Sequence, residues 1–271
     1  MKPLCGNKKP VFFIKTKDFS NSGKTFNLMR CPSTGLVFTS PIPKNINSYY
    51  DKNRYDSYKQ DSSFFGLLYG FVQKINGKHK LSLIKKGASL LDYGAGSGFF
   101  VNLSLKVGVN AVGYEPINKL KNKHVFNTLK DIGNKKFDYI TMWHVLEHTH
   151  DPLKTLVDLR KKLKNNGRVI IALPNTDSYD NTYYGKYWAG YDVPRHLYHF
   201  NKGSFGVLCK KAGFKLVETK PLYFDSFYVS MLSEKYKKNI FWPFFGFVVG
   251  LLSNIMALFT KNHSSIIYII K

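Results

Sequence analysis

From residue 88 onward, short apolar runs alternate along the chain with segments that have the spacing of helices. The runs SLLDYG, NAVGYEP, KFDYITMW and RVIIALP have the composition of buried strands. A helix is expected after the first run, ending at Gly108, and another is expected to begin at Asp151 and Pro152, to include Leu163 and to stop before Gly167. This alternation predicts an α/β domain with a mainly parallel sheet, whose ligands bind at the carboxyl ends of its strands.

A glycine-rich turn, GAGSG at residues 94–98, follows the first of these strands and opens the first helix. Glycine lets a backbone turn tightly and approach a ligand closely, and a helix N-terminus offers N–H groups to an anion. The third glycine position of the dinucleotide fingerprint G-x-G-x-x-G is Phe99, which argues against a nicotinamide site. Glu115 ends the second strand, where a carboxylate can accept both ribose hydroxyls, so a nucleoside ligand of undecided class is expected.

The spacing G-x-G-x-G, with Asp92 two residues before the first glycine, resembles motif I of class I S-adenosylmethionine-dependent methyltransferases. FDYITMWHVLEHTHDP, GRVIIALPN and YDVPRHLYHFNKGSFGVLCKKAGF resemble further segments of the methyltransferase domain 23 and ubiquinone-biosynthesis-like group, and the likeness covers residues 85–235. It implies a Rossmann-like fold with helices on both faces of a seven-stranded, mostly parallel sheet. FKLVETK and SSIIYIIK would be its sixth and seventh strands, the seventh antiparallel.

The same resemblance implies an enzyme with S-adenosylmethionine as cofactor, acting on an oxygen, nitrogen or carbon acceptor of a small or lipid-linked molecule. The residues expected to bind the cofactor are Asp92, Tyr93, Gly94, Ala95, Gly96, Gly98, Glu115, Pro116, Trp143 and His144. A ribose or nucleic-acid methyltransferase is the alternative enzyme, although Trp143-His144-Val145-Leu146 lacks the Asn/Asp-Pro-Pro-aromatic turn of base-amine methylation. A non-catalytic binding subunit that has the fold of these methyltransferases is the alternative outside enzymes, although the intact glycine turn and Glu115 argue against it.

His144-x-x-Glu147-His148 matches the inverted zinc-peptidase signature letter for letter. That motif must lie within one helix for both histidines to face the metal. Here a strand is expected to end near Trp143 and the next helix to begin at Asp151, so the segment is expected to be a turn beside the cofactor and not a peptidase site.

Three hypotheses remain for this segment. It forms part of the cofactor pocket, it supplies a general base as His148 or His196, or it binds a divalent metal through His144, Glu147, His148 and His196. Small-RNA 2′-O-methyltransferases use a related cluster, with Glu at the position of His144. The residues assigned to catalysis are His148, His196, Glu147 and Arg195, and no metal ligand is assigned. Arg195 would bind an acceptor phosphate or carboxylate, or pair with Asp192 or Glu147.

Two apolar segments follow the fifth predicted strand. The aromatic insert, defined as Tyr179, Tyr183, Tyr184, Tyr187, Trp188 and Tyr191, is expected either to cover the acceptor or to pack locally. Residues 239–260 carry no charge and are flanked by lysines. A single membrane crossing is not expected, because the last strand must return to the sheet. A helical pair that touches an anionic membrane surface or covers a lipid-like acceptor is one expectation, and a hydrophobic cap or dimer face is the other.

Residues 1–60 are expected to form a degenerate zinc-knuckle-like region, and residues 61–271 the methyltransferase domain. LCG, RCPSTGLVFTSPIP and YYDKNRY match the frame of relatives that have a four-cysteine knuckle, but only Cys5 and Cys31 stand at thiolate positions. Two thiolates make a poor structural zinc site, so no metal is expected there. A helix is expected over about Phe64–Ile75.

The net charge of +24, from 41 basic and 17 acidic residues, would suit an anionic partner. The lysines are spread along the whole chain, however, which favours a composition bias, and nucleic acid is not an expected partner. Three widely spaced cysteines and an N-terminus without an apolar segment lead us to expect a cytoplasmic protein, at the inner face of the membrane if residues 239–260 touch lipid.

Overall fold

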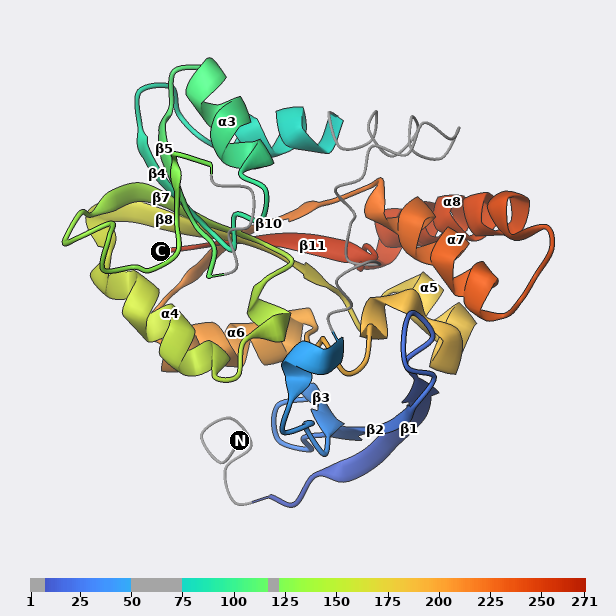
Figure 1. The fold of residues 1–271 in the computed structure, drawn as a ribbon. Helices are drawn as coiled ribbons and strands as arrows, with labels where there is room; N and C mark the ends of the chain where they lie inside the picture. Colours follow the sequence, from blue (N-terminus) through green and yellow to red (C-terminus); the bar gives the residue numbers. More distant parts are fainter. Residues whose placement is uncertain (1–7, 50–74, 117–121) are drawn as a thin grey trace.

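The computed structural model describes residues 8–49, 75–116 and 122–271. At its centre lies a seven-stranded sheet in the order β10-β11-β8-β7-β4-β5-β6 (Figure 1). The strands are β4 (Ser89–Tyr93), β5 (Asn110–Tyr114), β6 (Val125–Phe126), β7 (Phe137–Trp143), β8 (Leu163–Pro174), β10 (Leu216–Pro221) and β11 (Ser265–Ile270). β11 runs antiparallel to β10 and β8, and the other neighbours are parallel. The predicted fold class is confirmed.

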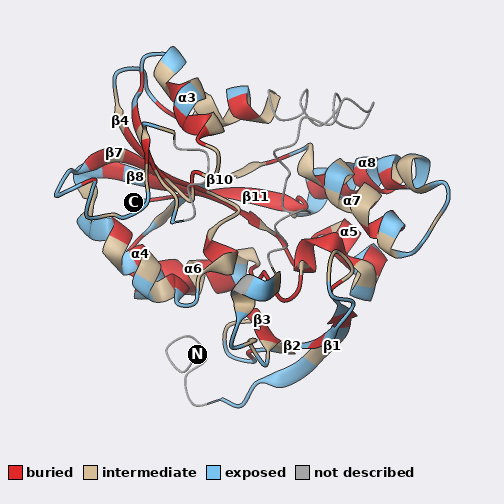
Figure 2. Cartoon of the chain, in the orientation of Figure 1, coloured by how far each residue is buried: buried red, intermediate tan, exposed pale blue. Residues whose placement is uncertain are grey.

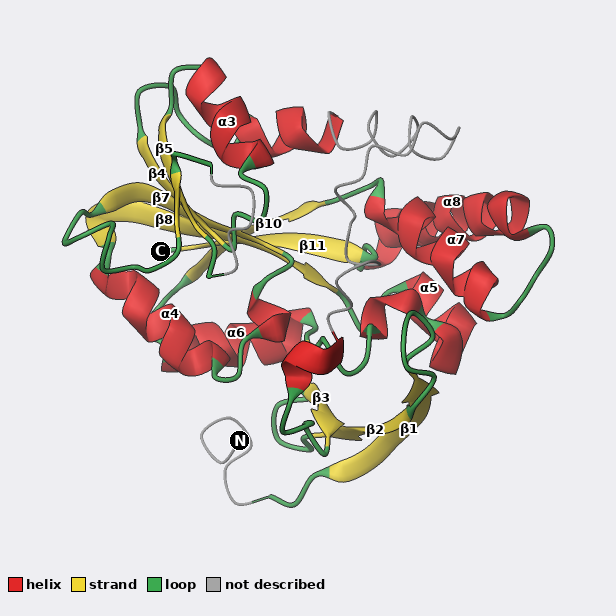
Figure 3. Ribbon diagram, in the orientation of Figure 1, coloured by secondary structure: helices red, strands yellow, loops and turns green. Residues whose placement is uncertain are grey.

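Helices cover both faces of this sheet (Figure 3). α3 (Phe99–Lys106) and a helix that includes residues 75–81 lie on one side, and α4 (Pro152–Lys161) and α6 (Lys202–Lys211) on the other. The Asp151 carboxylate accepts a hydrogen bond from the Lys154 amide at 2.9 Å, as expected for an N-cap. Of the helix predicted over Phe64–Ile75, only residue 75 lies within the described residues, and it is helical.

The expected inclusion of Leu163 in the helix after Asp151 is wrong. α4 ends at Lys161, and Leu163 is the first residue of β8, where it pairs with Phe137 of β7. The backbone N–H of Phe137 also donates to the carbonyl of Lys162 at 2.9 Å. Pairing with β7 therefore overrides the helical spacing of the apolar residues in this segment.

The central strands of the sheet are mostly buried (Figure 2), and apolar clusters pack against the sheet. All six residues of β11 are buried, as expected for a central strand covered by helices. On one face Leu156 and Phe205, from α4 and α6, belong to the same buried cluster as Ile171 and Tyr268. The carboxyl ends of β4, β5, β7 and β8 consequently form a fixed edge on which loops can present side chains.

A second, four-stranded sheet is formed in the order β1-β2-β3-β9. Its strands are β1 (Val11–Lys17), β2 (Thr25–Arg30), β3 (Val37–Ser40) and β9 (Tyr198–His199), and a 3-10 turn, η1 (Ile46–Tyr49), follows β3. β9 comes from the chain after β8, so this sheet is completed by the larger domain. Cys31 is buried here and Cys5 lies outside the described residues, so the metal-free knuckle stays a prediction.

A helical hairpin, α7 (Asp225–Tyr236) and α8 (Trp242–Thr260), connects β10 to β11. The two helices pack closely: a Cβ atom on Gly246 would lie 2.4 Å from Cα of Met231, and one on Gly250 would lie 2.8 Å from Cα of Phe227. Among the described residues, α8 alone has the length and composition to cross a membrane, and 28% of its apolar window is buried. As expected, the chain returns from it to the centre of the sheet.

Candidate active site

The glycine turn lies between the carboxyl end of β4 and the start of α3. Gly94, Gly96 and Gly98 have φ values of +79°, +52° and +78°, which L side chains rarely adopt. A Cβ atom on Gly94 would lie 2.4 Å from Cγ2 of Val145, in the segment after β7. The turn therefore needs glycine both for its backbone conformation and for its close approach to β7.

Glu115, at the end of β5, faces this turn. Its Oε2 atom accepts a hydrogen bond from the Gly96 amide at 3.1 Å. The amides of Gly94 and Ala95 donate to the carbonyl of Tyr114 at 2.8 and 3.0 Å. A carboxylate for ribose hydroxyls and a glycine-built helix N-terminus thus lie together, with Pro116 next to them, as a nucleoside cofactor with a charged tail requires.

Asp92 and Tyr93 end β4 directly below the turn. The Asp92 carboxyl is buried, and Oδ1 accepts a hydrogen bond from Thr141 Oγ1 at 2.7 Å. Burial raises the pKa of Asp92 to about 6, against the opposing effects of Thr141 and Lys80. Burial likewise raises the pKa of Tyr93 to about 12. Asp92 thereby joins β4 to β7 and adds negative charge beneath the cofactor turn.

Trp143 presents its indole to a cation. The Lys80 ammonium lies 4.5 Å from the ring centroid, and Phe100 packs edge-on at 5.2 Å. Burial lowers the pKa of Lys80, while the carboxylates of Asp225 and Asp92 act to raise it. The indole of Trp143 therefore has a cation against its face, and its place beside a sulfonium stays a prediction. No local pattern in the sequence distinguishes Lys80 from the other lysines.

His144 has a left-handed backbone, with φ of +55°, and connects two elements. Its Nε2 lies 3.0 Å from Oδ2 of Asp225, and its Nδ1 lies 3.5 Å from Oε1 of Glu147. Burial lowers the pKa of His144, but the hydrogen bond to Asp225 and the nearby carboxylate of Glu147 outweigh it and raise the pKa to about 9. His144 is therefore a cation at neutral pH, held between two carboxylates.

Glu147, His148 and His196 form one cluster. Glu147 and His148 lie on the 3-10 turn η2 (Leu146–His148), and ligand atoms of the three side chains all lie within 4.8 Å of one another. The short turn excludes the single helix that a zinc-peptidase motif needs. Burial, with the charge of His196, lowers the pKa of His148 to about 4, which makes it a weak base at neutral pH.

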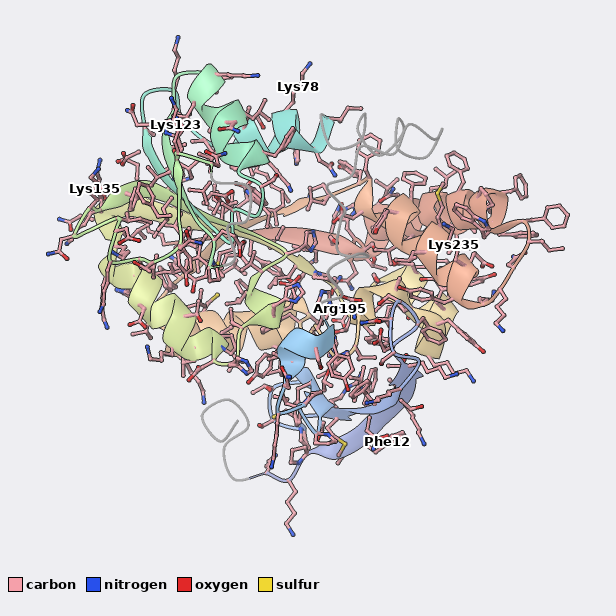
Figure 4. The ribbon with its side chains drawn as sticks, viewed as in Figure 1. Phe12, Lys78, Lys123, Lys135, Arg195 and Lys235 are labelled. Atoms are coloured by element: carbon pink, nitrogen blue, oxygen red, sulfur yellow. The ribbon has the colours of Figure 1, made fainter. Side chains whose placement is uncertain are left out.

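The structure brings Arg195 to the N-terminal sheet (Figure 4). Its Nε donates to Oδ2 of Asp192 at 2.9 Å, and its Nη2 donates to Oδ1 of Asp18 at 3.2 Å. Nη1 donates to the carbonyl of Tyr49 at 3.1 Å, and Ser20 Oγ also accepts from Nη2. The pairing with Asp192, one of the alternatives expected for Arg195, is confirmed. These contacts give the guanidinium a structural role, because they join the segment of Arg195 to the N-terminal part of the chain. Its assignment to catalysis stays a prediction without support from its contacts.

The aromatic insert is mostly packed. Trp188 and Tyr191 are fully buried, and they share a cluster with Phe26 and Leu28 of the N-terminal sheet. The indole N–H of Trp188 donates to Oδ2 of Asp180 at 2.7 Å. Of the two expectations for this insert, local packing describes these residues. α5 (Tyr179–Tyr184) carries the exposed Tyr183.

Comparisons with known proteins agree with this arrangement. Residues 70–219 match the model of a methyltransferase domain family, the group numbered 23. An uncharacterised protein of Methanocaldococcus jannaschii is 28% identical over 149 residues, which are 50% of this chain and 63% of that protein, so the chain spans less than two thirds of its length. An S-adenosylmethionine-dependent methyltransferase structure from Archaeoglobus fulgidus has a TM-score of 0.51 at 19% identity, covering 80% of this chain and 97% of that one. Phosphoethanolamine N-methyltransferase 2 of Haemonchus contortus, solved with S-adenosylmethionine, has a TM-score of 0.50 at 17% identity, covering 98% and 69%.

Proposed function

We propose that this chain, which belongs to the methyltransferase domain family, methylates a lipid-linked acceptor at a membrane surface. The predicted enzyme class, an S-adenosylmethionine-dependent methyltransferase, and the predicted cofactor are supported by membership of this family. The acceptor, the membrane contact and a location at the inner face of the membrane are the parts that we propose.

S-adenosylmethionine, when bound, supplies an electrophilic methyl group on a sulfonium. Glu115 would accept the ribose hydroxyls, and the amides of the glycine turn would face the anionic end of the cofactor. Trp143 would lie beside the positive charge. The protein's main contribution is to hold the acceptor in line with the methyl group, because positioning supplies much of the rate of such a transfer.

The observation that carries the proposal is the position of the α7–α8 hairpin. α7 begins at Asp225, which is hydrogen-bonded to His144 beside the predicted cofactor site. The hairpin leaves the sheet after β10 and returns at Ser265, which pairs with Pro174 at the carboxyl end of β8. An acceptor held in lipid under this hairpin would therefore lie close to the edge of the sheet that bears the glycine turn.

One face of α8 is suited to lipid. Gly246, Val249, Gly250, Ser253 and Ala257 are buried, while large apolar side chains cover the opposite face and the hairpin tip. Ile240 is 86% exposed, Phe259 80% and Phe244 66%. The other exposed apolar residues here are Phe241, Phe245, Phe247, Leu251, Leu252, Ile255, Met256 and Leu258. So large an apolar surface is typical of an interaction site.

The charges beside this face favour an anionic bilayer as its partner. Lys235, Lys237 and Lys238 lie at the tip of the hairpin, and Lys261 follows its far end. A lysine near an anionic leaflet contributes about 1 kcal/mol to membrane binding. A second copy of this chain, with the same net charge of +24, would bring like charges together. These charges favour the membrane over the dimer face or soluble cap.

The acceptor class is tested with S-adenosylmethionine carrying a labelled methyl group, the purified full chain and a membrane-containing extract of the source cells. We expect label in the organic phase. Label in small aqueous metabolites would contradict a lipid-linked acceptor, and label in acid-insoluble polymer would favour the nucleic-acid alternative. No labelling together with no binding of S-adenosylmethionine would favour the non-catalytic alternative.

The membrane contact is tested by flotation with vesicles. We expect the wild type to bind vesicles that contain phosphatidylserine and to release them at high salt. Phe244→Ser with Phe259→Ser should abolish most binding, because both side chains are exposed in α8. Phe12→Ser, at a 61% exposed position in β1, is the matched control and should bind as the wild type does. Equal flotation of all three proteins would contradict a contact through α8.

A further inference from the structure

We propose that Glu147, His148 and His196 form a binding site for one divalent transition-metal ion, of the class to which Zn²⁺ belongs. The three side chains offer one carboxylate oxygen and two imidazole nitrogens, and these atoms lie within 4.8 Å of one another. Methyl transfer alone does not require such an ion, so the site goes beyond the proposed function. From the sequence, a divalent metal at this segment is one of three hypotheses, and no residue is assigned as its ligand.

The environment of Glu147 is the strongest indication of a metal site. Its side chain is 1% exposed, and within the described residues neither carboxylate oxygen has a hydrogen-bond partner. Its nearest charged neighbours are His144 Nδ1 at 3.5 Å and His196 Nε2 at 3.9 Å from Oε1. A buried carboxylate without hydrogen bonds is costly, which is why buried charges in proteins are closely paired or coordinate metals. A cation between Glu147 and the two imidazoles would satisfy it.

Both histidines are oriented by backbone carbonyls. His148 Nδ1 lies 3.1 Å from the carbonyl oxygen of Arg195, and His196 Nδ1 lies 2.9 Å from that of Gly190. A carbonyl only accepts, so each Nδ1 carries a proton and each Nε2 carries the lone pair. Metal-binding histidines are held in this way, with one ring nitrogen on the metal and the other donating to a carbonyl or carboxylate.

The backbone around the cluster is fixed before any ion binds. The Leu197 amide donates to the carbonyl of Glu147 at 2.8 Å, which joins η2 to the segment that carries His196. Thr39 of β3 donates through Oγ1 to the carbonyl of His196 at 2.8 Å. The three side chains therefore need only small rotations to converge on one ion.

The donor set decides the class of ion. Two imidazoles and one carboxylate suit Zn²⁺, Fe²⁺, Co²⁺ or Ni²⁺, whereas Mg²⁺ and Ca²⁺ prefer oxygen ligands. Three protein ligands leave at least one coordination position open for water or another oxygen, as in catalytic zinc sites. His144 Nδ1 lies 3.5 Å from Oε1 of Glu147 and would help to hold the carboxylate in place.

The test uses the full chain after treatment with a chelator, titrated with Zn²⁺ by calorimetry. We expect one ion per chain for the wild type, and binding that is weaker by roughly tenfold or more in Glu147→Gln and His196→Gln. His150→Gln, at an exposed histidine in the same segment, is the matched control and should bind Zn²⁺ as the wild type does. No binding by the wild type, or undiminished binding by both ligand variants, would overturn the proposal.

A Co²⁺ spectrum of the wild type gives a readout that does not depend on the folding of Glu147→Gln or His196→Gln. Nitrogen and oxygen ligands give weak visible bands, whereas thiolates add a strong near-ultraviolet band. We expect the first pattern, unchanged by Cys31→Ser. A thiolate band that disappears in Cys31→Ser would place the ion in the N-terminal region and overturn the site. Neither measurement uses an acceptor, so a failure of the proposed lipid substrate would leave the outcome unaffected.

Discussion

Nε2 of His144 lies 3.0 Å from Oδ2 of Asp225, although the two residues are 81 positions apart. His144 follows β7 and Asp225 is the first residue of α7, so this contact fixes the base of the hairpin to the carboxyl edge of the sheet. The left-handed backbone of His144 costs about 1 kcal/mol or more, and an ion pair with a partly buried aspartate compensates for it. The contact therefore links the predicted cofactor site to the proposed membrane-facing element.

Asp225→Asn should loosen this link. The asparagine keeps the size of the side chain but removes the charge that stabilises the imidazolium, and loss of a charged hydrogen bond costs about 1.5–3 kcal/mol. We expect faster amide hydrogen exchange at the start of α7, with little change in the central strands. Asp158→Asn removes an exposed carboxylate from α4 and serves as control. Exchange that is equally slow in α7 of both variants would show that the ion pair does not hold the hairpin.

Most strands and helices can be predicted from the sequence, but the contact between His144 and Asp225 cannot. Alternating apolar runs predicted the sheet because strand burial is a local pattern, and the glycine turn predicted the cofactor site because tight turns leave a local signature. Asp225 and Lys80 carry no such signature, since their importance comes from contacts across distant parts of the chain. Leu163 was misplaced for a related reason: pairing with Phe137 overrides its helical spacing.

Gly94→Ala should weaken binding of S-adenosylmethionine. The new methyl group would lie 2.4 Å from Val145 Cγ2 at a backbone with φ of +79°, so the turn must move away from β7. We expect the affinity for S-adenosylmethionine to fall by about tenfold or more, because the turn positions several backbone amides that would contact the cofactor. Gly133→Ala is the matched control: φ is +68° but nothing lies within 4 Å, so only the backbone cost of about 1–2 kcal/mol in stability is expected. Equal affinity of the two variants, measured by calorimetry, would argue against close approach at Gly94.

Glu115→Gln should also reduce cofactor affinity, while leaving the fold intact. Glu115 accepts from the Gly96 amide, and an amide oxygen can keep that contact. The glutamine lacks the negative charge that strengthens hydrogen bonds from the two ribose hydroxyls. Hydrogen bonds to a charged group contribute about 1.5–3 kcal/mol to stability or binding. We expect weaker binding of both S-adenosylmethionine and its demethylated product, measured by calorimetry. Glu218→Gln, on the exposed strand β10, should bind both as the wild type does. An unchanged affinity in Glu115→Gln would remove Glu115 from the cofactor site.

Arg195→Gln distinguishes a structural from a catalytic part for this residue. Removing the guanidinium leaves the buried carboxylate of Asp18 without its cation, and breaking a buried ion pair costs about 3–5 kcal/mol. We expect a large loss in the free energy of unfolding and rapid hydrogen exchange in β1 and β2. Arg168→Gln, at an exposed position in β8, should have little effect. A variant as stable as the wild type but unable to methylate would instead support the catalytic assignment.

Asp138→Asn should make the stability of the protein less sensitive to acid. Hydrogen bonds from Lys164 and Ser89 lower the pKa of Asp138 to about 2, and they join the starts of β4, β7 and β8. A folded-state pKa below the unfolded value of about 3.9 means that the stabilisation is fully present above pH 4 and is lost as the pH falls towards 2. Because the side chain is 38% exposed, solvent screening reduces the effect to about 1 kcal/mol.

Urea unfolding of the wild type and Asp138→Asn at several pH values measures this difference. We expect the wild type to be more stable at pH 7 and at pH 5, and the difference to shrink steadily below pH 4. Asp131→Asn, at an exposed loop position, is the control for loss of a carboxylate. A difference that stays constant down to the lowest pH at which both proteins fold would mean that it comes from the shape of the side chain. A difference that shrinks would show that the Asp138 charge itself holds the three strands together.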